Sequence, residues 1–251
     1  MNAPAHLTHL LAFDTATEHL NVVLATPQGQ WLVEEAGGSK ASVRLIPAIR
    51  DLLAQGACTW SDLTAIGFGR GPGAFTGLRT AASVAQGLAF GAGKPVLSID
   101  TLMAVAQDAR MLLQDCGSLI PASGHVWVVM DARMDEIYAA HYQWSHGQWH
   151  TLVQPHLTNP EALHQAWQVG PPQVVAGTAL SAFGARLTPG SGAVCVPEAL
   201  PRGPALRHLA QQGWNSGEAM DAALALPTYI RDKVAQTTAE RASIKVAGSL
   251  R

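Results

Sequence analysis

The sequence predicts an α/β fold made of two related halves. Short strand-like runs alternate with helix-like runs, and a βββαβαβ order is complete near residue 99. A similar series of runs begins again near residue 125, offset by about 117 residues between Asp14 and Asp131. This offset exceeds the roughly 20 to 50 residues of solenoid repeats, so we expect a duplicated α/β subdomain.

The first half is expected to start with an antiparallel meander. The meander covers three short apolar or β-rich runs separated by turn-like segments: residues 10–14, 20–26 and 31–35. Two further strands are expected later in this half, over residues 65–68 and 95–99. Apolar residues at helical spacing predict a helix over residues 42–53, and a second helix over residues 76–90 follows a glycine-rich loop.

The second half repeats details of the first. Its expected strands are residues 126–131, 137–143, 148–153 and 173–176. The first strands end in Asp14 and Asp131, and the third strands open on Gly-Gln-Trp in both halves. A helix near residues 161–167 precedes the turn AGTALSAFG, which is similar to FGRGPGAFTG of the first half.

These observations give a domain division. We expect a first subdomain over residues 1–104 and a second over residues 105–204. The helical segment at about 205–226, with its core at 206–225, is a candidate to return to the first subdomain. The polar residues 232–251 are expected to form a flexible tail.

Composition excludes several classes of protein. Lys and Arg total 16 against 18 Asp and Glu, so the net charge of −2 provides no general attraction for nucleic acid. Cys58, Cys116 and Cys195 are widely spaced, which argues against a disulfide framework and a zinc knuckle. The start of the chain lacks a signal-peptide pattern, and no apolar run approaches the ~18 residues of a membrane span. We therefore expect a cytoplasmic protein without membrane contact.

The loop GRGPGAFTGLR raises the question of phosphate binding. It fails as a Walker motif because Leu78 stands where lysine is required. Gly69, Gly71 and Ala74 do match the dinucleotide pattern G-x-G-x-x-A, with Asp100 as a candidate ribose ligand, and this is the best enzyme alternative.

A steric explanation of the loop is favoured. Gly71 and Gly73 permit unusual backbone angles, Thr76 is a candidate helix cap, and Gly77 permits close approach in the first turn. The helix then carries a narrow, mostly alanine face suited to close helix packing. With apolar residues of the preceding helix, this face gives the expected partner interface: Leu45, Ile49, Leu52, Leu78, Ala81, Ala82, Ala85 and Leu88.

A second motif follows the first strand. Asp14-Thr-Ala-Thr17 resembles the phosphate-contacting D-x-G-x-T hairpin of actin-like and sugar-kinase ATPases, although Ala16 replaces its glycine. An Asp and a Thr that satisfy a turn are an equally good explanation. The residues of this candidate vestigial phosphate loop are Asp14, Thr15, Thr17, Gly71, Gly73, Thr76 and Gly77.

Metal and nucleophile sites are not predicted. His146 and His150 have an H-x-x-x-H spacing, but a turn and strand between them would hold the rings too far apart for one ion. No G-x-S-x-G elbow occurs, and we assign no catalytic residues.

Several segments together resemble the TsaB family, also called YeaZ. They are LAFDTATE, GRGPGAFTGLRTAASVAQGLAF, PVLSIDTL, VVMDARMDEIYAA and PTYIRDKVAQ. The resemblance implies an actin-like ATPase (ASKHA, ribonuclease H-like) fold of two related subdomains. One departure is Ala41-Ser42, where many relatives have His-Ser.

The resemblance also implies a function in a complex. Members pair with a TsaD-like catalytic paralogue to form N6-threonylcarbamoyladenosine (t6A) at position 37 of tRNA, and a TsaE-like ATPase joins them. The subunit itself would be non-catalytic and without a cofactor, while ATP and metal would belong to partner subunits. The helices over residues 42–53 and 76–90 would form the pairing surface, tRNA would be contacted indirectly, and a homodimer is a further option.

Two alternatives stay open from the sequence. An independent nucleotide-dependent enzyme on the same fold would bind ATP by itself. A protease or chaperone of the same superfamily is the other alternative, and the missing nucleophile constellation argues against the protease.

Overall fold

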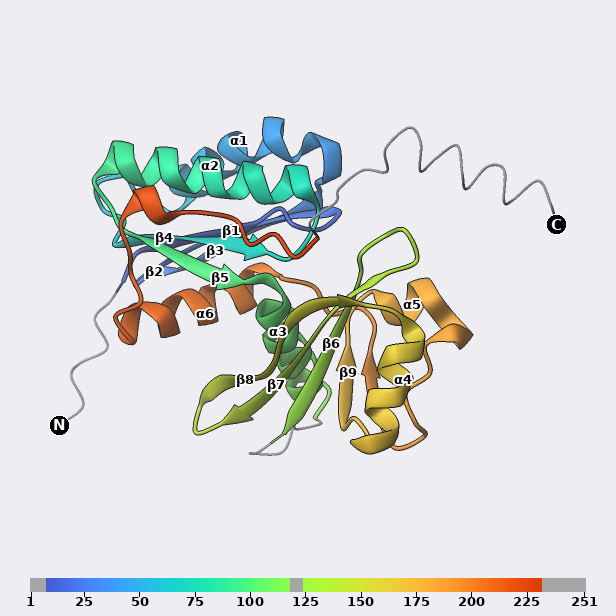
Figure 1. Ribbon diagram of the computed structural model, residues 1–251. Helices are drawn as coiled ribbons and strands as arrows, with labels where there is room; N and C mark the ends of the chain where they lie inside the picture. Colours follow the sequence, from blue (N-terminus) through green and yellow to red (C-terminus); the bar gives the residue numbers. More distant parts are fainter. Residues whose placement is uncertain (1–7, 118–123, 232–251) are drawn as a thin grey trace, which may run out of the picture.

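The computed structural model describes residues 8–117 and 124–231, which form two five-stranded mixed sheets (Figure 1). The first sheet contains β1 (Leu10–Asp14), β2 (His19–Thr26), β3 (Gly29–Ala36), β4 (Ala65–Gly71) and β5 (Val96–Asp100). The second contains β6 (His125–Asp131), β7 (Ile137–Ser145), β8 (Gln148–Thr158), β9 (Val174–Ala176) and β10 (Val194–Val196). Their spatial orders, β3-β2-β1-β4-β5 and β8-β7-β6-β9-β10, are the same.

Each sheet is built around its first strand. β1 pairs antiparallel with β2 and parallel with β4, and β6 pairs in the same ways with β7 and β9. All five residues of β1 are buried, which explains its continuous apolar sequence. The matching strand orders and pairings confirm the predicted duplication.

Helices cover the sheets on both faces. α1 (Ala41–Gln55) and α2 (Phe75–Ala92) lie side by side on one face of the first sheet, as Figure 1 shows. α4 (Pro160–Val169) and the short α5 (Ala179–Phe183) cover the outer face of the second sheet. Short 3-10 turns occur at Gly38–Lys40, Gly184–Arg186 and Ala222–Leu224. No helix in the described part of the chain is long and apolar enough to cross a membrane.

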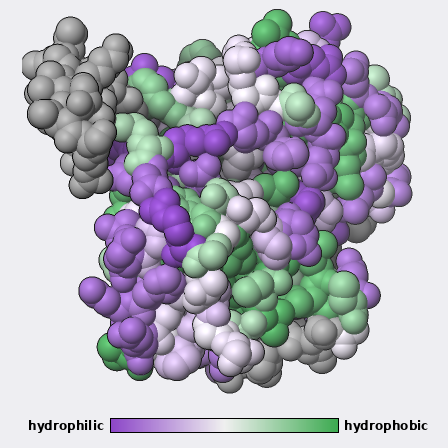
Figure 2. All heavy atoms as spheres, turned by 90° about the vertical axis from the view of Figure 1, so that its right-hand side faces the viewer, coloured by the Kyte–Doolittle hydropathy of each residue, from purple (hydrophilic) through white to green (hydrophobic). Residues whose placement is uncertain are grey.

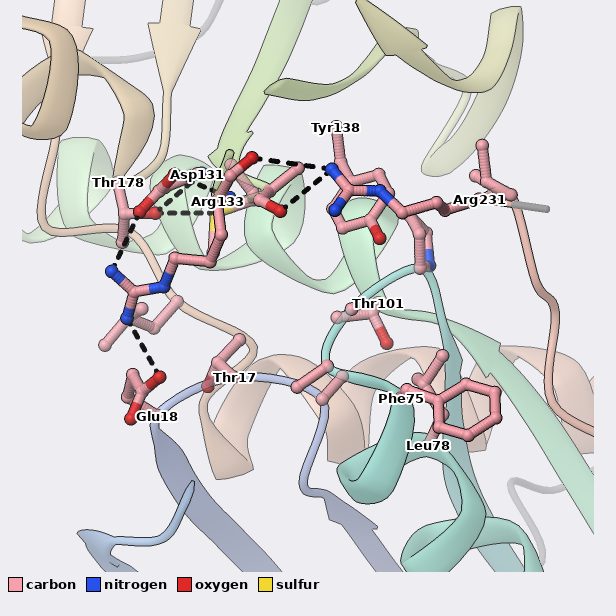
Figure 3. Close-up of a pocket in the computed structure, with 18 of the residues that line it drawn as sticks. Thr17, Glu18, Phe75, Leu78, Thr101, Asp131, Arg133, Tyr138, Thr178 and Arg231 are labelled. Atoms are coloured by element: carbon pink, nitrogen blue, oxygen red, sulfur yellow. Dashed lines mark hydrogen bonds and ion pairs between the residues drawn. The ribbon is translucent and has the colours of Figure 1, made fainter. Parts of the chain in front are cut away.

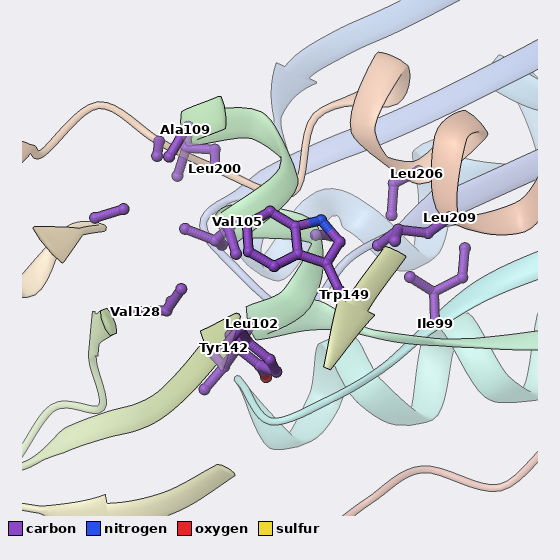
Figure 4. Packing of buried hydrophobic residues seen from close by; sticks show 14 of the residues in the cluster. Ile99, Leu102, Val105, Ala109, Val128, Tyr142, Trp149, Leu200, Leu206 and Leu209 are labelled. Atoms are coloured by element: carbon purple, nitrogen blue, oxygen red, sulfur yellow. The ribbon is translucent and has the colours of Figure 1, made fainter. Parts of the chain in front are cut away.

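The last helix of each half packs against the sheet of the other half. α3 (Thr101–Asp115) follows β5 in the chain but contacts β6, β7 and β9, whereas α6 (Gly203–Asn215) contacts β1, β2 and β5. The side chains between the sheets form one continuous core, which contains Leu102 and Val105 of α3, Leu206 and Leu209 of α6, and Trp149 of β8 (Figure 4). The two halves are therefore joined at their base by apolar packing.

The helices of the structure differ from the expectation in two places. α3 was not expected; Asp100 caps its start by accepting hydrogen bonds from the amides of Leu102 and Met103. The helix expected over residues 206–225 ends at Asn215, because Gly217 turns the chain with φ +74°. The 232–251 tail lies outside the described residues.

The start of α2 also differs from the expectation. Ala74 holds the N-cap position, and no side chain caps this end of the helix. Thr76 instead lies exposed in the first turn, where its carbonyl accepts a hydrogen bond from the hydroxyl of Thr80. Gly93 ends the helix in the left-handed region at φ +64°.

Candidate functional site

A cleft of about 710 Å³ separates the two sheets on the side away from the shared core. Its walls are the β1–β2 turn, the glycine-rich loop, the β6–β7 turn and the chain segment that ends at Arg231 (Figure 3). Thr101 and Leu200 line its depth, and Phe75, Leu78 and Met130 add apolar surface. The volume falls in the range of small-molecule sites, so this cleft is the first place to test for a ligand.

The glycines of the loop are required by close packing against the β1–β2 turn. A Cβ atom added at Gly69 would lie 1.8 Å from Oδ2 of Asp14, and one at Gly73 would lie 2.4 Å from the carbonyl oxygen of Ala16. A Cβ at Gly77 would lie 1.8 Å from the carbonyl oxygen of Thr15. The loop and the turn that are candidates for a vestigial phosphate site therefore pack closely against each other, as the steric explanation expects.

Hydrogen bonds complete this contact. The amide of Ala74, at the start of α2, donates to the carbonyl of Ala16 at 2.7 Å. The hydroxyl of Thr15 donates to the carbonyl of Gly77 at 2.7 Å. Thr17 lines the cleft, and its hydroxyl accepts a hydrogen bond from the amide of His19 within the turn. The amide of Ala74 and the hydroxyl of Thr15 are thus engaged within the protein, between the loop and the β1–β2 turn.

Asp14 is fully buried below the cleft. One carboxylate oxygen accepts a hydrogen bond from the amide of Ala16 and the other accepts one from the hydroxyl of Thr101, both at 2.7 Å. The same hydroxyl accepts a hydrogen bond from the amide of Gly71 at 3.1 Å. Burial raises the pKa of Asp14 to about 6, and the two hydrogen bonds only partly oppose this shift. This carboxyl group ties three segments together.

Asp100 has a structural position rather than the expected ribose contact. Its carboxylate caps α3 and accepts a hydrogen bond from the hydroxyl of Tyr142 at 2.8 Å. Burial raises its pKa. Both oxygens are thus engaged within the protein, one at the start of α3 and the other with Tyr142.

The residues expected at the partner interface lie in the interior of the first half. Six of them belong to the buried cluster between these helices and the first sheet: Leu45, Ile49, Leu52, Ala81, Ala82 and Ala85. Leu88 is partly buried and packs against this cluster. Leu78 is also buried. The expectation was wrong about which face of these helices reaches solvent, because small side chains are needed here to bring α1 and α2 close to the sheet.

The outer faces of the same helices carry exposed apolar and small residues. Val43 and Ile46 of α1 are 71% and 44% exposed, and Phe90 of α2 is 84% exposed. Gly87 and Gly91 lie in α2 with nothing within 4 Å of an added Cβ atom. The sequence signal for this surface is the pair of glycines four positions apart within a helix.

Other sequence candidates are not brought together. His146 lies in the β7–β8 turn and His150 in β8, both exposed to solvent. Within residues 8–117 and 124–231, no group of three or more His, Cys, Asp or Glu side chains is placed to hold a metal ion.

Residues 228–231 and the β6–β7 turn were not identified as parts of a site from the sequence. The amide of Thr228 donates to the carbonyl of Arg70 at 2.7 Å, and Arg231 forms an ion pair with Glu136. In the sequence, the segment PTYIR is part of the family resemblance and carries no other signal of a site. Its role across the cleft depends on contacts between residues about 95 positions apart, which a single sequence does not reveal.

Comparison with known proteins identifies the family. The model of the family described as "TsaD: tRNA N6-adenosine threonylcarbamoyltransferase" matches residues 34–213. The Escherichia coli (strain K12) "tRNA threonylcarbamoyladenosine biosynthesis protein TsaB" is 32% identical over 90% of this chain and 96% of its own length. The protein of the same name from Haemophilus influenzae is 33% identical over 90% of this chain and 94% of its own. The chain belongs to the TsaB family.

Solved structures agree with this TsaB assignment. "YeaZ from Pseudomonas aeruginosa" is 34% identical with a TM-score of 0.76, covering 89% of this chain and all of that chain. A second structure, of "an uncharacterized protein with similarity to peptidase YEAZ from Pseudomonas aeruginosa", is also 34% identical, with a TM-score of 0.77 and coverage of 90% and 100%. The α/β, actin-like (ASKHA-type) fold that the resemblance implied is confirmed.

Proposed function

We propose that this protein is a non-catalytic subunit that pairs with a TsaD-like catalytic paralogue in the formation of N6-threonylcarbamoyladenosine at position 37 of tRNA. The names of its relatives support the pathway. The pairing surface that we propose is the outer face of α1 and α2.

One observation carries this proposal: Gly87 and Gly91 lie one helical turn apart in α2, and neither is required by packing inside the protein. A glycine within a helix costs roughly 0.5 to 1 kcal/mol relative to alanine. Glycines that face solvent at this spacing allow a second helix to approach closely. A partner helix on this face would explain why both are tolerated.

The neighbouring helix adds apolar area to the same face. Val43 and Ile46 of α1 point to solvent, although side chains of this type are usually buried. α1 and α2 lie side by side on the first sheet, so their outer faces form one surface (Figure 1). An apolar surface with a groove of small residues suits two helices of a related subunit.

The absence of catalysis is supported by the closed glycine loop. The amide of Ala74 and the space at Gly73 and Gly77 are taken by the β1–β2 turn. We propose that ATP and metal are bound by the TsaD-like and TsaE-like partners instead. The net charge of −2 supports contact with tRNA through the complex rather than by this chain alone.

The pairing surface is tested by Gly87→Arg. The variant should fold, because Gly87 is exposed, an added Cβ atom meets nothing within 4 Å, and arginine favours a helix over glycine. Binding to the TsaD-like partner should weaken by more than about a hundredfold, since ~3 kcal/mol is lost when a cation is placed in the seam. Size-exclusion chromatography with light scattering and calorimetry measure this loss.

A matched control places the same charge on another helix. Ala166→Arg changes an exposed residue of α4 and should leave pairing intact. Unchanged binding by the folded Gly87→Arg variant would show that the partner binds elsewhere. If the parent chain forms a homodimer, the same variant tests whether both assemblies use this face.

An independent nucleotide-dependent enzyme is the second candidate, favoured by the 710 Å³ cleft alone. Calorimetry with Mg-ATP distinguishes the two. We expect weak or undetectable binding by the isolated chain, and a micromolar dissociation constant would support the enzyme instead.

A further inference from the structure

We propose that residues 226–231 form a strap that, together with the Glu18–Arg133 ion pair, holds the two halves of the protein closed across the cleft. Arg231 is the residue of this strap that binds the second half. The proposal concerns the opening of the cleft and does not depend on the proposed function.

The strap is anchored first on the glycine loop and α2. The amide of Thr228 donates to the carbonyl of Arg70 at 2.7 Å. The ring of Tyr229 packs on Phe75 with 5.3 Å between ring centroids, and its hydroxyl accepts a hydrogen bond from Nε of Arg79 at 3.1 Å. The guanidinium of Arg79 also lies 3.9 Å from the centroid of the Phe75 ring. These contacts fix the strap to the first half.

The second anchor lies on the opposite wall of the cleft. The side chain of Arg231 is 13% exposed, forms an ion pair with Glu136, and donates to the carbonyl of Ala132 at 3.2 Å. Figure 3 shows Arg231 among the residues that line the cleft. Its Nε is buried and has no hydrogen-bond partner among the described residues. A largely buried, charge-assisted contact of this kind is strong when made and costly when one partner is removed.

A second and weaker ion pair joins the two halves at the opposite edge of the cleft. Arg133 of the β6–β7 turn contacts Glu18 of the β1–β2 turn at 2.9 Å, and both side chains are mostly exposed. Exposed pairs contribute little because water and salt screen them. We therefore expect Arg231 to dominate the closure and Arg133 to assist it.

The β6–β7 turn, residues 132–136, is held in an unfavourable conformation. Arg133, Met134 and Asp135 have φ values of 61°, 56° and 63°, in the left-handed region that L residues rarely adopt. Three ion pairs to separate segments hold this turn: Arg133 with Glu18, Asp135 with Arg186, and Glu136 with Arg231. Loss of the contacts across the cleft would let the turn relax.

The base of the cleft limits where opening occurs. Leu102 and Val105 of α3 are fully buried between the halves, together with Leu206 of α6. A packed core of this kind does not deform continuously. Motion would therefore take place at the mouth, where the strap and the two turns meet.

The test measures the distance across the mouth by pulsed electron resonance. Spin labels are attached at Ser39→Cys, beside the β1–β2 turn, and Ser181→Cys on α5, in a background in which Cys116 and Cys195 are serine; all four sites are exposed. Arg231→Met should shift and broaden the distance distribution towards longer values. Amide exchange in residues 132–136 and 226–231 should become faster by about tenfold.

Three further variants decide the outcome. Glu136→Gln removes the same ion pair by changing the partner of Arg231. It is used in place of Arg231→Met if that variant fails to fold. Arg133→Gln should give a smaller shift. Arg186→Gln breaks the Asp135 ion pair within the second half and should leave the distance unchanged. The proposal is overturned by an unchanged distance in both Arg231→Met and Glu136→Gln, or by an equal shift in Arg186→Gln.

Discussion

The two halves of the protein share a topology but differ in the helices that cover their outer faces. α1 and α2 contain 15 and 18 residues, whereas their counterparts α4 and α5 contain 10 and 5. The strand orders of the two sheets are nevertheless the same. Duplication has thus preserved the sheets, while helix length distinguishes the surfaces. Only the first half presents a broad face of two long helices.

The surface of the second half has a different character. Figure 2 shows one side of the molecule, on which hydrophobic residues gather in the lower part of the view, over the second half. Its exposed apolar side chains include Val169 at the end of α4 and Val194 on β10. They are spread over separate elements and do not follow one helix face.

The largest expected effect is a loss of stability when arginine is placed on the inner face of α2 but not on its outer face. Ala85 is fully buried on the inner face of α2. Ala85→Arg should therefore destabilise the fold by about 5 kcal/mol through an unpaired buried charge and overpacking. Ser83→Arg places the same side chain on the exposed face and should fold normally. Urea unfolding measures both variants. Equal stability of the two would mean that the inner face is not part of the core.

The next effect compares two glycines of the same helix. Gly77→Ala forces a Cβ atom against the backbone of Thr15 and should destabilise the protein by about 4 kcal/mol. Gly87→Ala meets nothing within 4 Å and should stabilise it by about 0.5 to 1 kcal/mol. Thermal and urea unfolding provide the comparison. A tolerated Gly77→Ala would contradict the tight contact between α2 and the β1–β2 turn.

The third prediction concerns the pH dependence of stability and compares Asp14 and Asp131, the aspartates that end the first strand of each half. The folded state raises the pKa of Asp14 from 3.8 to about 6, so the folded protein binds this proton more tightly than the unfolded chain. This group should therefore reduce stability by about 2 to 3 kcal/mol as pH rises from about 4 to about 6. Urea unfolding over this range should show the slope, and Asp14→Asn should remove it.

The matched control for this slope lies in the second half. Asp131 is half-buried and forms an ion pair with Arg133 at 3.2 Å. Asp131→Asn should leave the Asp14 slope in place. A pH dependence unchanged in Asp14→Asn would assign the slope to other carboxyl groups.

The sequence predicted the repeated meanders because their strands alternate with clear turns and carry the same Asp and Gly-Gln-Trp landmarks. It did not reveal α3, although Asp100 precedes apolar residues at helical spacing, among them Leu102, Val105 and Ala109. Asp100 was considered instead as a ligand for ribose. A strand-end aspartate has the same sequence pattern in both roles, and only the fold distinguishes them.

The inner and outer faces of α2 could not be distinguished from composition. Small residues such as Ala81 and Ala85 permit close packing equally well against a sheet of the same chain and against a partner. Exposed Gly87 and Gly91 are more informative, because the structure gives them no internal contact. The strap was missed because its contacts join residues far apart in the chain.

The exchange of α3 and α6 has a consequence for synthesis on the ribosome. On the lower face of the first sheet, β1 and β2 are covered by α6, which begins at Gly203. Until that residue leaves the exit tunnel, side chains such as Leu10 and Val23 have no helix above them. The first half therefore cannot complete its fold until α6 has been synthesised, and the nascent chain carries an exposed apolar sheet until then.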